Sequence, residues 1–208
     1  MDTADDAEEY DAMDHVQVNA AFVADLLARL GAPHLVLDVG TGTALIPLEL
    51  GRRTDATRVV GVDMAREMLR LGRRNIARTS PRQRIVLLLA DAKHLPFGDR
   101  SVPAVASNSL VHHIPDPRAV LAELVRVAAR PVRLFVRDLL RPSDEHALQA
   151  LVDKHAADGT PKQRAMLADS LRASLTLEEL RGMVSGLGFS PESVQQTSDR
   201  HWTWCVGP

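Results

Sequence analysis

The chain has 208 residues, a formal net charge of −2 at pH 7, and 45% hydrophobic and 25% charged residues. This length and composition are typical of one globular domain, so we expect a single domain over residues 1–208. The net charge and an aromatic content of only 3% disfavour a nucleic-acid-binding surface.

The N-terminal residues and the cysteine count bear on where the protein works. Residues 1–9 carry five acidic side chains, which predicts a solvated acidic tail and is the opposite of a signal or transit peptide. No run approaches the roughly 18 apolar residues of a membrane span. The single cysteine, Cys205, excludes an internal disulfide and favours a reducing compartment. We therefore expect a cytoplasmic protein with no membrane span.

A helix is predicted before the first strand. Apolar residues such as Phe22 and Leu26 recur at helical spacing from about His15 to Leu30, and Gly31 ends the pattern. We expect residues 10–31 to form an N-terminal lid helix.

The stretch from Leu35 to Thr43 combines a strand with a glycine turn. The apolar run that contains Asp38 predicts a buried strand, and Gly40 and Gly42 predict a tight turn before a helix. Because glycine has no Cβ, a ligand can lie directly against this backbone. The N–H groups that begin the following helix point into the same space.

Four further apolar runs predict strands that alternate with helices. Because these runs are apolar throughout, we expect both faces of the strands to be covered. The alternation predicts a doubly wound, mostly parallel α/β sheet with helices on both faces. The predicted strands span residues 35–38, 58–62, 85–89, 104–107 and 132–136, and the helices between them include residues 65–77 and a helix that begins at Asp116 and Pro117.

The pattern changes after Pro142. Two polar helical segments, Ser143–Ala157 and Pro161–Ala173, follow without a strand between them, so residues 142–174 are predicted to be a helical insertion. Thr176 and Glu179 predict a capping box at the start of the next helix. Two short segments, residues 192–197 and 201–205, predict a closing strand pair in which Trp202 and Trp204 pack on one face.

Polar residues stand where the predicted parallel strands end. In such sheets, ligands bind beside the carboxyl ends of the strands. A buried carboxylate needs partners, so acids at successive strand ends indicate a binding site. The strand-end residues are, in order, Asp38, Asp63, Asp91, Ser107 with Asn108, and Asp138.

A glycine turn followed by an acid at the end of the next strand suits an adenosine ligand, because a carboxylate can accept hydrogen bonds from both ribose hydroxyls. Nicotinamide dinucleotides and S-adenosylmethionine both fit this logic. The dinucleotide fingerprint needs a third glycine three residues after Gly42, where this chain has Leu45. Asp91, which can accept from the adenine amine, suits the sulfonium cofactor better.

At this point the chain resembles the class I S-adenosylmethionine-dependent methyltransferases, and most closely their small-molecule branch that includes the quinone-biosynthesis enzymes. The resemblance implies a seven-stranded sheet of order 3-2-1-4-5-7-6. Three positions depart from the family pattern, at Ala44, Ala65 and Arg130–Val132. The matching segments are Val36–Thr43, Val60–Asp63 with Met68 and Leu69, Asp91–Ala92 with Leu95–Phe97, Ser107–Asp116, and Leu134–Val136.

The resemblance also implies roles for individual residues. Gly40, Thr41 and Gly42 would pass under the methionine part of S-adenosylmethionine, with Asp38 at its amino end. Asp63 would bind the ribose or, alternatively, only cap the helix beside it. The remaining implied cofactor contacts are Met64 and Ala92 beside adenine, Asp91 at its amine, and Ser107 near the sulfonium.

The residues of the acceptor site are less sharply defined. Methyl transfer needs alignment of the acceptor, exclusion of water and removal of any released proton. Candidate catalytic residues are His112, His113 and Asp138, although the His-His loop can also serve only to shape a turn. The predicted lid helices, within residues 10–31 and 142–174, supply most of the candidate substrate contacts, and covering the sheet is an equally good interpretation of those residues. The candidates are Tyr10, Met13, His15, Asn108, His112 and Arg172, and we leave open whether Arg137 binds an anionic acceptor or pairs with a carboxylate.

The sequence therefore predicts a methyltransferase for a small organic acceptor, with no metal site. A non-catalytic module that binds S-adenosylmethionine or S-adenosylhomocysteine, and a nicotinamide-dependent reductase, stay as alternatives. We expect a monomer or homodimer that binds no nucleic acid.

Overall fold

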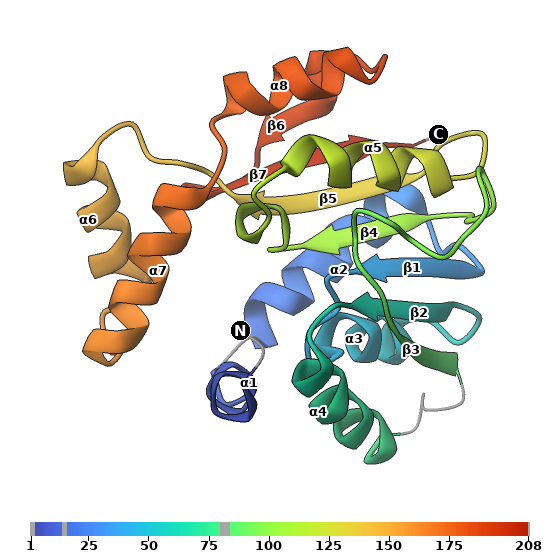
Figure 1. Cartoon of the computed structure of the whole chain (residues 1–208), viewed down its shortest axis with the longest axis horizontal. Coiled ribbons are helices and arrows are strands. Elements are labelled where there is room, and N and C mark those ends of the chain that lie inside the picture. Colours follow the sequence, from blue (N-terminus) through green and yellow to red (C-terminus); the bar gives the residue numbers. More distant parts are fainter. Residues whose placement is uncertain (1–2, 14–15, 80–83, 208) are drawn as a thin grey trace. The chain divides into compact units, whose positions relative to one another are not determined.

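The computed structural model describes residues 3–13, 16–79 and 84–207. It contains a seven-stranded sheet of order β3-β2-β1-β4-β5-β7-β6 (Figure 1), which confirms the predicted fold class and strand order. The strands are β1 (Leu35–Val39), β2 (Arg58–Asp63), β3 (Ile85–Leu89), β4 (Val105–Asn108), β5 (Leu134–Leu139), β6 (Val194–Gln196) and β7 (His201–Val206).

A helix follows each of β1, β2 and β4, no helix lies between β3 and β4, where every residue is described, and the last three helices follow one another after β5. In the described part of the chain, no helix has both the length and the apolar character needed to cross a membrane. The helices are α1 (Ala4–Asp11), α2 (Val16–Leu30), α3 (Leu45–Arg53), α4 (Arg66–Ala77), α5 (Pro117–Val127), α6 (Glu145–His155), α7 (Pro161–Ala173) and α8 (Leu177–Gly186), with single 3₁₀ turns at η2 (Val111–His113) and η3 (Pro191–Ser193).

The chain divides into two compact units. The first contains residues 1–108, 122–135 and 206–208, and the second contains residues 109–121 and 136–205. The expectation of a single domain over residues 1–208 stays a prediction.

In the first unit, β1, β2 and β3 pair in parallel, and β4 pairs in parallel with β1. The fully buried ring of Phe22 on α2 meets Phe135 edge to face, with 5.2 Å between the ring centroids. Gly61 lies where β2 passes closest to its neighbours, because a Cβ there would lie 2.6 Å from Thr41 Oγ1 and 2.8 Å from Leu87 Cδ2. This close packing brings the glycine turn against the end of β2.

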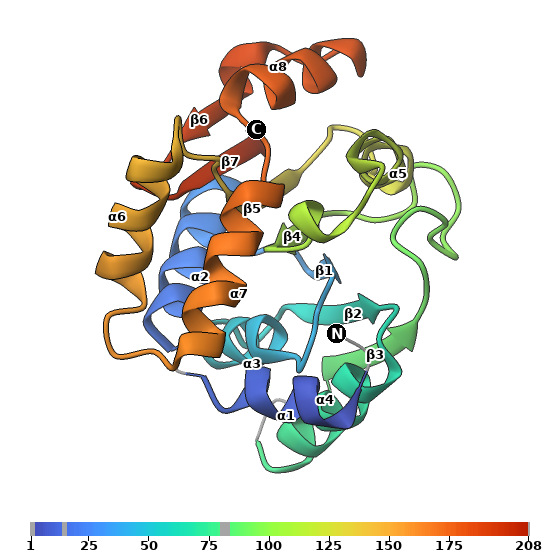
Figure 2. The same cartoon turned by 60° about the vertical axis from the view of Figure 1, so that its left-hand side comes forward.

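The first residues are not the tail that the sequence predicts. Residues 4–11 form α1, which lies beside α4 (Figure 2), so the predicted acidic tail is wrong over most of its length. Ala7 is fully buried against Met68 and Leu71, and Asn75 donates to Asp11 across 2.9 Å. The prediction of one helix over residues 10–31 is also wrong, because residues 10 and 11 belong to α1 and residues 16–30 form α2. Contacts with α4 stabilise a helix that is too short to form alone.

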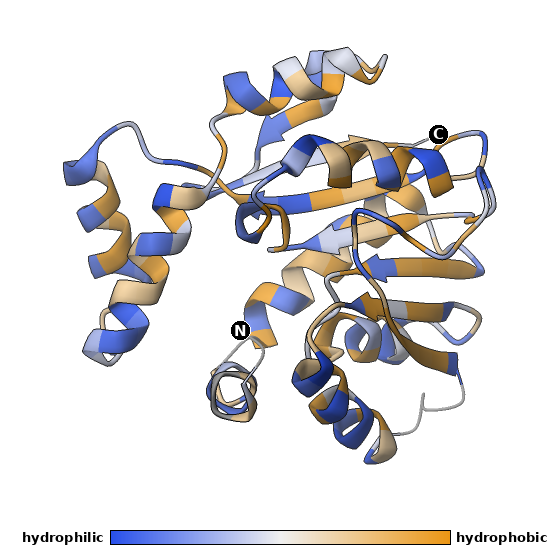
Figure 3. Ribbon diagram, viewed as in Figure 1, coloured by the Kyte–Doolittle hydropathy of each residue, from blue (hydrophilic) through white to orange (hydrophobic). Residues whose placement is uncertain are grey.

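The prediction that both faces of every strand are covered is wrong for β3. Val86, Leu88 and Leu89 are 61%, 36% and 45% exposed. β3 is an edge strand, and residues 90–104, all of them described, contain no helix to cover its outer face. Figure 3 shows this strand as strongly hydrophobic as the buried β1.

In the second unit, α6 and α7 lie side by side (Figure 2) and share an apolar cluster of Leu148, Val152 and Leu171 with Leu139 of β5. The capping box between Thr176 and Glu179 is present at α8, as predicted. β6 and β7 pair antiparallel, which confirms the closing pair, and Trp202 and Trp204 are fully buried.

Candidate functional site

The glycine turn after β1 has the left-handed backbone that its sequence suggests. Gly40 and Gly42 have φ angles of 79° and 53°, and Ala44, where the family has a third glycine, has φ 67°. The N–H groups of Gly40 and Thr41 donate to the carbonyl of Val62 across 2.8 and 3.0 Å. The turn is therefore fixed to the end of β2 by the backbone itself.

Asp63, at the end of β2, lies in contact with this turn. Its Oδ2 accepts from the N–H of Gly42 and its Oδ1 accepts from the N–H of Ala65, each across 2.8 Å. The second bond shows that Asp63 does help to start α4, as the alternative interpretation holds. Each carboxylate oxygen has a second lone pair, so a ribose hydroxyl remains a compatible partner.

Asp38 is buried behind the turn and accepts from Thr41 Oγ1 across 2.7 Å. Burial raises the pKa of Asp38 to about 7, the Thr41 hydrogen bond lowers it in part, and the charge of Asp63 raises it further. A carboxyl held in this state gains an ion pair when a cationic group, such as an ammonium, comes beside it.

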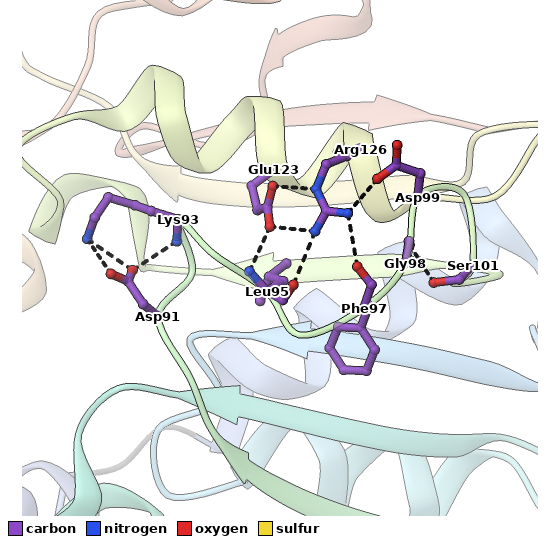
Figure 4. A network of polar contacts seen from close by, with 9 residues as sticks. All are labelled: Asp91, Lys93, Leu95, Phe97, Gly98, Asp99, Ser101, Glu123 and Arg126. Atoms are coloured by element: carbon purple, nitrogen blue, oxygen red, sulfur yellow. Dashed lines mark hydrogen bonds and ion pairs between the residues drawn. The ribbon is translucent and has the colours of Figure 1, made fainter.

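The end of β3 carries a charged pair. Asp91 accepts from both the backbone N–H and the Nζ of Lys93, across 2.9 and 3.0 Å (Figure 4), and these bonds lower the pKa of its carboxyl. Ala92 beside it is buried. Any ligand amine that binds Asp91 therefore shares it with Lys93.

A polar network on α5, which the sequence analysis missed, holds the loop after Asp91 (Figure 4). Glu123 accepts from the N–H of Leu95 across 2.7 Å. Arg126 donates to the carbonyls of Leu95 and Phe97 across 3.1 and 2.9 Å, and it also pairs with Glu123. The i, i+3 spacing of Glu123 and Arg126 was the only available signal, because their loop partners lie about thirty residues away in the chain.

The remaining predicted cofactor residues lie at the ends of β2 and β4. Met64 is 66% exposed, so its apolar side chain is available to a flat ligand. Ser107 is fully buried and donates to the carbonyl of Val39 across 2.8 Å, which joins β4 to β1. Asn108, which ends β4, is half-buried.

In the second unit, the structure brings all three predicted catalytic residues together. His112 Nδ1 and Asp138 Oδ1 are 2.5 Å apart, and the two side chains are 5% and 1% exposed. Asp138 also accepts from the backbone N–H groups of His112 and Leu139. The rings of His112 and His113 are in contact, with 3.9 Å between their centroids and an angle of 43° between their planes.

The two histidines differ in their electrostatics. Burial lowers the pKa of His113 to about 4, the neighbouring His112 lowers it further, and Asp138 opposes the shift. His113 is therefore neutral and weakly basic at neutral pH. His112, oriented by a carboxylate through Nδ1, is the better placed proton acceptor of the two.

The predicted substrate contacts belong to both compact units of the chain. Tyr10 lies beside the glycine turn, where a Cβ on Gly42 would be 3.8 Å from its ring, and Met13 is half-buried nearby in the chain. Arg172 pairs on α7 with Glu145 and Asp169 at the surface. His15 lies outside the described residues. Arg137 is buried and its Nε donates to Thr203 Oγ1 across 2.9 Å, a partner that the sequence did not predict.

A bare left-handed turn, a strand-end acid in contact with it and a buried acid bonded to it are features that suit an adenosyl ligand. Comparisons with known proteins agree. A family model described as a methyltransferase domain matches residues 36–130. A crystal structure of an S-adenosylmethionine-dependent methyltransferase from Aquifex aeolicus covers 97% of this chain and 96% of that one, with a TM-score of 0.68 at 16% identity.

The relatives of known function indicate the branch of methyltransferases to which the chain is most similar. The demethylmenaquinone methyltransferase of Porphyromonas gingivalis is 34% identical over 112 residues, which are 53% of this chain and 46% of that protein. The demethylmenaquinone methyltransferase of Renibacterium salmoninarum is 30% identical over 172 residues, which are 77% of this chain and 68% of that protein. The chain thus spans about half of the first relative and about two thirds of the second. It belongs to the class I S-adenosylmethionine-dependent methyltransferases, in the branch that includes the quinone-biosynthesis enzymes.

The cofactor of this family is S-adenosylmethionine, and the residues present are suited to it. The turn has no Cβ at Gly40 or Gly42, so a ligand can approach its backbone. The buried carboxyl of Asp38 has a raised pKa and would be stabilised in its charged form by an ammonium group. Met64 exposes an apolar side chain next to Asp63 in the chain.

Proposed function

We propose that this chain transfers the methyl group of S-adenosylmethionine to a small organic acceptor. When bound, the cofactor supplies an electrophilic methyl group on a good leaving group. The observation that carries the proposal is the hydrogen bond from Gly42 N–H to Asp63, because it holds the ribose-binding type of acid against the bare turn. The alternatives, a binding module without catalysis and a nicotinamide-dependent reductase, are not favoured by the family relationship.

Within this proposal, the first unit holds the cofactor. Asp38 attracts its ammonium group, and Gly40, Thr41 and Gly42 lie under the methionine part. Asp63 accepts from the ribose and Met64 packs on adenine. The contacts proposed beyond these are Asp91 at the adenine amine, with Ala92 beside it, and Ser107 at the end of β4.

His112 is proposed as the general base. Asp138 is a positioning residue, because it fixes the ring of His112 through Nδ1 and leaves Nε2 to take a proton from the acceptor. A base of this kind is useful when the reacting group of the acceptor, an O–H or an acidified C–H, must lose a proton. The name of one relative, a ubiquinone/menaquinone biosynthesis C-methyltransferase, supports an acceptor of this chemical kind.

Three side chains are proposed to contact the methyl acceptor. Met13 and Asn108, both half-buried, are candidate wall residues, and so is the surface residue Arg172. We propose further that α2, α6 and α7 form a lid, that the protein works in the cytoplasm as a monomer or homodimer, and that it binds no nucleic acid. The formal net charge of −2 and the aromatic content of 3% support the last of these statements.

Calorimetry with S-adenosylmethionine, S-adenosylhomocysteine and NAD tests the cofactor assignment. We expect micromolar binding of the first two and no binding of NAD. Release of S-adenosylhomocysteine with a panel of hydroxylated aromatic acceptors then tests catalysis. Binding without turnover of any acceptor favours the non-catalytic module, and binding of NAD alone favours the reductase.

A further inference from the structure

Tyr10 occupies a position that its predicted role as an acceptor contact does not explain. It is the only tyrosine in the chain. Its ring carbon Cε1 would lie 3.8 Å from a Cβ on Gly42, so the ring stands directly beside the turn. Burial raises the pKa of Tyr10 to about 12, and the nearby charges of Asp38, Asp63 and Asp11 add to the shift. The ring is therefore close to both acids of the cofactor site.

The helix that carries Tyr10 is fastened to the same turn. Ala7, one helical turn before Tyr10, is fully buried against Met68 and Leu71 of α4. Asn75 donates both to Asp11 of α1, across 2.9 Å, and to the carbonyl of Thr43 in the turn, across 3.2 Å. The packing of Ala7 and the hydrogen bond to Asp11 hold α1 against α4, and the Tyr10 ring lies next to Gly42.

We propose that Tyr10 is a cofactor-specificity residue whose aromatic ring binds the sulfonium end of S-adenosylmethionine and makes the site prefer it to uncharged S-adenosylhomocysteine. This inference rests on the proposed function. An aromatic face attracts a cation through its quadrupole, and the attraction increases when water is excluded. The turn beside the ring is the part of the site assigned to the methionine end, which carries the positive sulfur. The product has lost that charge, so the ring favours the substrate form of the cofactor.

Binding constants of four proteins separate this role from simple packing of α1. Tyr10→Phe keeps the ring, Tyr10→Leu keeps apolar bulk without the ring, and Glu8→Ala is a matched control on the exposed side of α1. We expect Tyr10→Leu to weaken the binding of S-adenosylmethionine by about 3-fold to 30-fold. The affinity for S-adenosylhomocysteine should change by less than about 3-fold. Tyr10→Phe and Glu8→Ala should keep the wild-type preference. Equal losses for both ligands in Tyr10→Leu would overturn the inference.

A spectroscopic measurement on the intact wild-type chain covers the case in which Tyr10→Leu folds poorly. Because the chain has one tyrosine, labelling with 3-fluorotyrosine gives a single fluorine resonance. We expect S-adenosylmethionine to shift this resonance more than S-adenosylhomocysteine does. If both ligands bind and the resonance shifts equally or stays in place, the specificity role is wrong while the proposed function stands. If neither ligand binds, the proposed function itself fails.

Discussion

The N–H of Gly42 donates to Oδ2 of Asp63 across 2.8 Å, and this bond joins the turn after β1 to the acid that ends β2. The second oxygen of Asp63 holds the N–H of Ala65 at the start of α4. One carboxylate therefore connects two strand ends and a helix within the protein alone. The turn and the start of α4 are held in place by these hydrogen bonds within the protein.

The first prediction concerns how much the Asp63 carboxylate stabilises the folded protein. Asp63→Ala should lower the free energy of unfolding by about 1–3 kcal/mol, because the N–H groups of Gly42 and Ala65 lose a charged partner. Urea denaturation of the ligand-free protein measures this change. Asp55→Ala, at an exposed position before β2, is the control and should leave the urea midpoint almost unchanged. An equally small effect in both variants would mean that Asp63 has no structural role.

The second prediction concerns Gly61. Gly61→Ala should destabilise the protein by about 1–3 kcal/mol, because the new Cβ would overlap Thr41 Oγ1 and Leu87 Cδ2. Displacement of Thr41 also disturbs its bond to buried Asp38, so cofactor affinity should fall. Gly182→Ala, inside α8 with no atom within 4 Å of the new Cβ, should instead stabilise by about 0.5–1 kcal/mol. A neutral Gly61→Ala would contradict the close packing of β2 on the turn.

The third prediction uses the raised pKa of Asp38. The raised pKa keeps Asp38 protonated in the folded protein up to about pH 7, whereas the unfolded chain ionises it near the ordinary aspartate pKa of 3.8. The unfolded state therefore binds fewer protons between these values, and this residue lowers stability as the pH rises through that window. Asp38→Asn should gain stability over wild type from pH 4 to pH 8, by up to about 4 kcal/mol. Urea unfolding at several pH values measures this, and a constant difference would show that Asp38 is not shifted.

The first five strands and the order of the acids at their ends were accessible from the sequence, because apolar runs, glycines and acids are local signals. The order of the strands in the sheet came only from the resemblance to the class I methyltransferases. The helix α1 was not accessible, since it depends on burial of Ala7 against Met68 and Leu71, more than sixty residues away in the chain. Likewise, the run Ile85–Leu89 identifies a strand but cannot show that Val86 and Leu88 lie on an edge and remain exposed.

The same limit applies to the candidate site. The sequence placed Asp63 and Gly42 in one pocket, but it did not show that they bond to each other. It gave His112, His113 and Asp138 equal standing, and only their tertiary contacts separate the carboxylate-linked His112 from the desolvated His113. Pairs that are distant in the chain are decided by packing, which no local pattern records.

The fourth prediction rests on the proposed base. Asp138→Asn should lower kcat by about 10²-fold to 10⁴-fold with little change in cofactor affinity, because His112 loses the carboxylate that orients it. His112→Gln should have a similar effect, and combining the two changes should add little. His146→Gln, at an exposed position on α6, is the control. Full activity in Asp138→Asn would contradict its positioning role, and full activity in His112→Gln would remove His112 from the mechanism.

A crystal structure with S-adenosylhomocysteine tests whether Asp63 and the glycine turn hold the cofactor. We expect electron density over the Gly40–Gly42 turn, with the ribose hydroxyls within hydrogen-bond distance of Asp63 and the adenine beside Met64. Density at any other place on the protein, or a ribose that does not contact Asp63, would contradict this expectation.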